Sequence, residues 1–84
     1  MAERSIVGTV THYFGRIGVA VVSLKSTLKV GDSIEIESGG AKLAQKVTSM
    51  QVNHKSVDSC KAGDEVGLKV DGKVHEGATV YKVS

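Results

Sequence analysis

The chain has 84 residues, a formal net charge of +2, and 40% hydrophobic residues. This length leaves room for one hydrophobic core, and the balanced composition excludes a disordered or fibrous protein, so we expect a single domain over residues 1–84. The 11 basic and 9 acidic residues nearly cancel, so charge permits nucleic-acid binding but does not predict it.

The sequence predicts a cytoplasmic protein. No run of about 18 apolar residues would span a bilayer, and the N-terminal MAERSI lacks the apolar core of a signal peptide. Cys60 is the single cysteine and cannot form an internal disulfide, which agrees with a reducing compartment. We therefore expect no membrane contact.

Residues 5–25 predict a β-hairpin. Residues 5–14 (SIVGTVTHYF) are rich in β-branched and aromatic side chains, and Gly15 and Arg16 provide a tight turn into residues 16–25 (RIGVAVVSLK). This second run is apolar on both faces, since one alternating set is Ile17, Val19 and Val21 and the other is Ala20, Val22 and Leu24. Such a strand is central in a sheet or lies against a second surface.

Four further strands are predicted. Residues 33–37 (SIEIE) alternate strictly, with Ile34 and Ile36 expected inside. Residues 42–53 form a long strand whose apolar residues do not share one face, which predicts a bulge near Ser49. Residues 65–70 and 78–83 supply the last two strands. Six short strands joined by glycine turns predict an all-β fold, either a closed or nearly closed barrel or an open two-layer sandwich.

A glycine-aspartate turn occurs twice, in LKVGDSIEI (residues 28–36) and in KAGDEVGLKV (residues 61–70). Glycine tolerates positive φ and the aspartate side chain accepts nearby backbone N–H groups, so this motif starts a strand. Together with VGTV at residues 7–10, and Glu76 with Gly77 before the last strand, these segments resemble the second domain of elongation factor Tu and other translational GTPases. The resemblance covers most of the chain.

The resemblance implies a six-stranded, antiparallel-rich barrel of the translation-protein type, here as a free-standing elongation-factor-like protein. A similar barrel is appended to some collagenase-like peptidases. The chain lacks the G-x-x-x-x-G-K-[ST] loop, so we expect no nucleotide hydrolysis. The family has an acidic residue that helps to hold the 3′ end of aminoacyl-tRNA, and the resemblance puts Gln51 at that position. Weak contact with RNA is expected rather than tight aminoacyl-tRNA capture.

Two groups of residues are candidate contacts with RNA or another partner. His12, Tyr13 and Arg16, beside Phe14, combine rings with a guanidinium as in sites that stack on unpaired bases, although the rings would also fill one end of a barrel. The second group surrounds the predicted fourth strand and would contact phosphates if its members share a face, or else form an ordinary solvated surface. Its members are Lys42, Lys46, Gln51, His54 and Lys55.

The sequence contains no catalytic or metal-binding pattern. His12, His54 and His75 are far apart, and Cys60 has no second cysteine, so we expect neither a metal nor a cofactor. Ser, His and Asp residues show no triad pattern, which predicts a protein that is not an enzyme. Cys60 next to Lys61 is either a reactive thiol or a loop residue without a role.

These observations lead to two functional hypotheses. The first is a non-catalytic, translation-factor-like module that contacts tRNA, ribosomal RNA or the ribosome through the face containing Gln51 and Lys55. The alternative is a protein-interaction barrel that docks on a partner protein or on a peptidase-type enzyme. A contiguous exposed apolar patch would favour the alternative.

Overall fold

The computed structural model describes residues 4–53 and 55–83, and these residues form ten strands. No helix in this part of the chain is long and apolar enough to cross a membrane. The strands are β1 (Arg4–Phe14), β2 (Val19–Leu24), β3 (Leu28–Lys29), β4 (Ser33–Ser38), β5 (Ala41–Lys46), β6 (Met50–Val52), β7 (Lys55–Val57), β8 (Ser59–Cys60), β9 (Glu65–Lys69) and β10 (Thr79–Val83).

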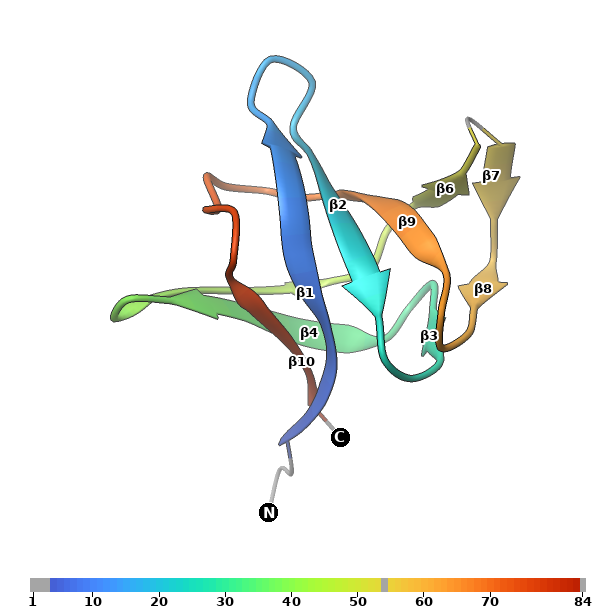
Figure 1. Cartoon of the computed structure of the whole chain (residues 1–84), viewed down its shortest axis with the longest axis horizontal. Helices are drawn as coiled ribbons and strands as arrows, with labels where there is room; N and C mark the ends of the chain where they lie inside the picture. Colours follow the sequence, from blue (N-terminus) through green and yellow to red (C-terminus); the bar gives the residue numbers. More distant parts are fainter. Residues whose placement is uncertain (1–3, 54, 84) are drawn as a thin grey trace.

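Eight strands form one antiparallel sheet in the order β5-β4-β10-β1-β2-β9-β6-β7, and β3 pairs with β8 in a small separate sheet (Figure 1). The green β4 runs crosswise to β1 and β2 in this view because the large sheet is strongly curled. The all-β, antiparallel prediction is confirmed, and β2 is central between β1 and β9. The prediction of six strands in a closed or nearly closed barrel is wrong, because the described residues form ten strands and the large sheet is open, with β5 and β7 as its unpaired ends.

The Gln45 side chain links β5 to the end of β9, although these two strands are not paired with each other. The Gln45 side chain donates from Nε2 to the carbonyl oxygen of Lys69 (2.8 Å), and its Oε1 accepts from the backbone N–H of Asp71 (2.7 Å). One amide group thus serves as donor and acceptor, as a peptide unit would in a ladder. The Gln45 side chain therefore holds the β5 edge of the sheet near the end of β9, although β5 and β9 are not paired as strands.

The predicted strand over residues 42–53 is interrupted, and the predicted bulge near Ser49 is wrong. β5 ends at Lys46 and β6 begins at Met50. Between them Val47 is buried, its N–H donates to the Asp32 carbonyl oxygen (2.8 Å), and its own carbonyl oxygen accepts from Gly31 (2.8 Å). These bonds fix Val47 against the first glycine-aspartate turn, so the chain leaves one edge of the sheet and enters the other.

Both glycine-aspartate turns form as the sequence predicts. Asp32 Oδ2 accepts from the backbone N–H of Lys29 (2.9 Å), and Asp64 Oδ2 accepts from that of Lys61 (3.2 Å). The preceding glycine has a φ of +97° in the first turn and +94° in the second, a conformation that favours glycine. One turn follows β3 and the other follows β8, so each of the two strands of the small sheet ends in a glycine-aspartate turn.

The core lies on the concave side of the curled sheet. Among the described residues it contains only hydrophobic side chains. Its members are Val7, Val10, Ala20, Val22, Leu24, Leu28, Ile34, Ile36, Val47, Met50, Cys60, Val66, Leu68, Val70, Val74, Ala78 and Val80. Ile34 and Ile36 point inward as predicted, and so does one of the two apolar sets of β2. The other set of β2 therefore faces outward.

Candidate functional site: an apolar groove on the outer face

The outer face of β1, β2, β9 and β6 carries apolar side chains that the core does not cover. Residues directly opposite each other on antiparallel strands project to the same side. One such row runs across four strands and consists of His12, Val21, Gly67 and Gln51. A second row joins Phe14, Val19 and Lys69. The outward set of β2 thus lies in the middle of this face.

Part of this face lines a hollow of about 310 Å³, called the apolar groove below. Its lining residues are Phe14, Ile17, Val19, Val21, Gln51, Asn53, Glu65, Val66 and Gly67. Phe14 is 51% exposed and Ile17 is 61% exposed, although both are large hydrophobic residues. Exposed apolar side chains beside a concave surface are typical of a binding site rather than of an ordinary solvated face.

Local backbone geometry builds two sides of the groove. At the tip of the β1–β2 hairpin, Ile17 N–H donates to the Phe14 carbonyl oxygen (3.3 Å), and Gly18 adopts a φ of +65°. This turn holds Ile17 outside the sheet. On the opposite side Asn53 has a φ of +52°, which asparagine accepts in tight hairpin turns more readily than most residues.

Gly67 forms the floor of the groove because it has no side chain. A Cβ atom there would lie 3.4 Å from Cγ1 of Val19 and 3.7 Å from the backbone oxygen of Gln51, which are ordinary contact distances. The glycine is therefore not required by crowding, and its effect is to leave the space above β9 empty. A larger side chain at this position would occupy the groove.

The neighbouring half of the outer face, on β1, β10, β4 and β5, has a different character and is called the ionic half below. Arg4 Nη1 lies 3.1 Å from Glu35 Oε1 and 3.2 Å from Glu37 Oε2. Its guanidinium also lies over the Tyr81 ring, 4.2 Å from the ring centroid. The hydrogen bonds that Arg4 donates to Glu37 and Glu35 raise the pKa of its guanidinium. The charges of this half are paired with one another.

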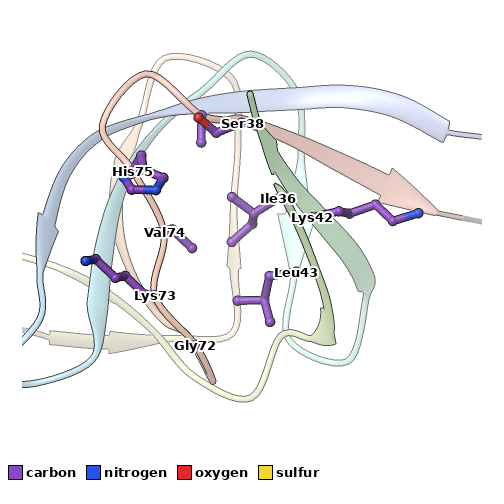
Figure 2. Close-up of a pocket in the computed structure, with 9 residues that line it drawn as sticks. Ile36, Ser38, Lys42, Leu43, Gly72, Lys73, Val74 and His75 are labelled. Atoms are coloured by element: carbon purple, nitrogen blue, oxygen red, sulfur yellow. The ribbon is translucent and has the colours of Figure 1, made fainter. Parts of the chain in front are cut away.

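A smaller hollow of about 140 Å³ lies between β4, β5 and the segment before β10 (Figure 2). Ile36, Leu43 and Val74 stand around its middle, whereas the ammonium groups of Lys42 and Lys73 point away from it in opposite directions. His75 lies at the rim. The hollow contains basic residues but does not gather their charges, so it lacks the convergent donors of an anion site.

The structure separates the first group of sequence-predicted contacts. His12 lies on the outer face with Phe14, their ring centroids 6.3 Å apart, and its Nδ1 is 3.4 Å from Glu76 Oε2. Tyr13 points to the other side and packs against the core. Arg16 is exposed in the hairpin turn. The three residues do not form one stacking surface, because neighbouring strand residues face opposite ways.

The second group is also dispersed. Lys42 and Lys46 are on β5 and Lys55 is on β7, the two opposite ends of the sheet order. Lys42 Nζ is 3.8 Å from Glu35 Oε1, so its charge is partly matched. Gln51 lies in the apolar groove. His54 lies outside the described residues. Binding by any of these residues remains a prediction.

The structure gives no geometry for a metal or a reactive thiol in the part of the chain that it describes. It brings together no group of three His, Cys, Asp or Glu residues suited to a metal ion. Cys60 is buried, and burial together with the charge of Asp64 raises the pKa of its thiol. A raised pKa keeps the thiol protonated, which opposes a reactive thiolate despite the adjacent Lys61.

Sequence reasoning identified part of the groove only. It selected Gln51 as a candidate contact with RNA or another partner, and it placed Phe14 either beside such a contact group or in one end of a barrel. It did not select Ile17, Glu65 or Gly67. The sequence did contain one indication of the groove. Residues 16–25 are apolar on both faces, which predicted either a central strand in the sheet or a strand that lies against a second surface. β2 is central, and the described residues supply no layer over its outer side.

Comparisons with known proteins point to peptidases. No protein-family model matches the chain. The chain is similar to an uncharacterized protease of Methanocaldococcus jannaschii, with 38% identity over 76 residues, which are 89% of this chain and 19% of that protein. The chain thus spans about a fifth of the length of this curated relative.

The fold is shared with two crystal structures of the C-terminal domain of a putative U32 peptidase from Geobacillus thermoleovorans. The first, a selenomethionine variant, has a TM-score of 0.85 and 18% identity over 90% of this chain and 96% of that domain. The second has a TM-score of 0.85 and 19% identity over 92% of this chain and 90% of that domain. At this identity the likeness shows the fold alone.

These findings correct the sequence-based assignment. The predicted relationship to elongation factor Tu and to free-standing elongation-factor-like proteins is wrong, because the similar proteins are a protease and a peptidase C-terminal domain. The predicted role in translation is wrong for the same reason. The comparisons give no support for tRNA, ribosomal RNA or the ribosome as partners. The alternative, docking on a peptidase-type protein, agrees better with them.

Proposed function

We propose that this chain is a non-catalytic binding module that docks on a peptidase-type protein through its apolar groove. The observation that carries the proposal is the exposure of Phe14 and Ile17 beside a concave, apolar surface. A partner covering them would remove apolar area from water, which stabilises a complex by about 25 cal/mol per Å². The single, buried Cys60 supports a cytoplasmic site of action.

The similarity to a protease supports the choice of partner. The matched segment is 19% of the protease of M. jannaschii, so most of that protein lies outside the part that this chain resembles. A domain of this fold is the C-terminal domain of a putative peptidase in G. thermoleovorans. Interfaces between domains bury apolar surface of the kind that the groove exposes.

The test is a calorimetric titration of this chain into the M. jannaschii protease from which the 76 matched residues have been deleted. We expect binding that weakens about tenfold or more when Ile17→Ser removes an exposed apolar anchor. Ile6→Ser is the matched control, since Ile6 is 52% exposed but lies in the ionic half, opposite Tyr81. It should bind like the wild type.

Circular dichroism of each protein establishes that a lost signal comes from the interface rather than from misfolding. If the folded wild-type chain does not bind the folded, shortened protease, the proposed function fails. The non-catalytic part has its own test, because the purified chain should not cleave fluorescein-labelled casein. Cleavage that survives repurification would contradict it.

A further inference from the structure

We infer that the apolar groove accepts a large apolar side chain from an extended segment of a protein partner, with a lysine or arginine within two residues of that anchor. This inference rests on the proposed docking function and adds the chemistry of the partner. It follows from the shape of the groove, from the carboxylate of Glu65 at its rim and from the side-chain amides of Gln51 and Asn53.

The shape favours a single bulky anchor. Phe14, Ile17 and the outward valines of β2 form an apolar wall, and Gly67 leaves the floor open. The hollow of about 310 Å³ is large enough for a leucine or aromatic side chain and too apolar to favour a charged one. The anchor would gain contacts on several sides and displace water from exposed Phe14 and Ile17.

The charge favours a basic neighbour. Among the described residues that line the groove, Glu65 is the one with an ionisable side chain. It forms no ion pair with the described part of the chain, in contrast to Glu35 and Glu37 of the ionic half. Lys69 lies farther along β9 and does not line the groove. A cation next to the apolar anchor would therefore meet an unmatched carboxylate at the rim.

The remaining wall suits a peptide backbone. Gln51 and Asn53 are exposed and line the side of the groove away from Ile17. Each primary amide has both donors and an acceptor, so the pair can serve the N–H and C=O groups of an extended segment without selecting a particular side chain. Selectivity then comes from the anchor and from the neighbouring charge.

The test uses nuclear magnetic resonance titrations of the full chain with three synthetic peptides, STRTFTRTS, STETFTETS and STRTATRTS. We expect the first peptide to shift amide signals of β2, β9 and the β1–β2 turn, with a Kd about fivefold lower than that of the acidic peptide. The alanine peptide should not bind measurably. Glu65→Lys should reverse the preference between the basic and acidic peptides.

Gly67→Leu should abolish binding by occupying the groove, and Ile17→Ser repeats this test without altering β9. Lys73→Glu, at the smaller hollow, is the charge-change control and should leave the preference unchanged. Equal affinity for the basic and acidic peptides, or shifts outside the groove, would overturn the inference. Protease docking without peptide binding would refute the inference alone, whereas peptide binding without docking would refute the proposed function.

Discussion

The two halves of the outer face share the strand β1 but meet solvent in different ways. In the ionic half Arg4 lies on Tyr81 and pairs with Glu35 and Glu37, so its charged groups already have partners within the chain. In the other half, which is formed by β1, β2, β9 and β6 and is called the apolar half, Phe14 and Ile17 remain exposed over the groove. A surface whose groups are mutually paired offers little to a partner, whereas an uncovered apolar surface gains from being covered. The difference indicates where binding occurs.

The largest predicted effect concerns Gly8, where β1 passes from one half to the other. Gly8 pairs with Val80 of β10 and with Leu24 of β2. A Cβ atom at this position would lie 2.4 Å from the backbone oxygen of Ser23, so the backbone itself would have to move. We expect Gly8→Ala to lower the free energy of unfolding by roughly 2–3 kcal/mol, measured by urea denaturation.

Gly67→Ala is the matched control for that experiment. Its Cβ atom would meet its nearest neighbours at 3.4 and 3.7 Å, and its φ does not require glycine. Its free energy of unfolding should stay within about 0.5 kcal/mol of the wild type. If Gly8→Ala and Gly67→Ala lowered the free energy of unfolding equally, the close approach of Gly8 to the backbone of Ser23 would not be important for stability.

The fold was predictable where one residue pattern fixes one local geometry. The alternation of Ile34 and Ile36 gave the buried face of β4, and the two glycine-aspartate turns formed as expected. The barrel closure was not predictable, because it depends on whether β5 and β7 meet across the curled sheet. The family was misassigned because its motifs are strand and turn devices, which report a fold and not a partner.

The site was less predictable than the fold. The groove requires the register of β1, β2, β9 and β6, and these strands are separated by long stretches of sequence. In the sequence, Gly67 is only a position without a side chain in an alternating strand. The strand register places it between Val21 and Gln51, and this position makes it the floor of the groove. The apolar residues on both faces of β2 indicated an uncovered apolar surface, but the same pattern is also explained by the central position of β2 in the sheet.

A smaller effect is predicted for the ionic half. Arg4→Met removes the ion pairs with Glu35 and Glu37 but keeps a side chain of similar length over Tyr81. We expect the urea midpoint to fall at low salt, by less than for Gly8→Ala, because exposed ion pairs contribute little. The difference from wild type should shrink in 1 M NaCl, where the screening length is about 3 Å.

Arg4→Lys keeps the charge and is the control for geometry. A lysine ammonium can take the place of Nη1, which alone contacts both carboxylates, but it lacks the planar guanidinium that lies over Tyr81. This variant should therefore lie between Arg4→Met and the wild type. A loss for Arg4→Met that is independent of salt would assign the effect to packing on Tyr81 instead of to ion pairing.

The smallest predicted effect on stability is at Ile17, although the same residue should have the largest effect on binding. Its side chain is 61% exposed, and its one turn hydrogen bond, to Phe14, comes from the backbone and is available to serine. The free energy of unfolding of Ile17→Ser should therefore change by less than about 0.5 kcal/mol in urea denaturation. Ile6→Ser should cost more, because Ile6 is paired with Tyr81 within the ladder. If Ile17→Ser destabilised the chain as much as Ile6→Ser, the apolar half would be part of what holds the fold together, and its exposure would no longer indicate a partner.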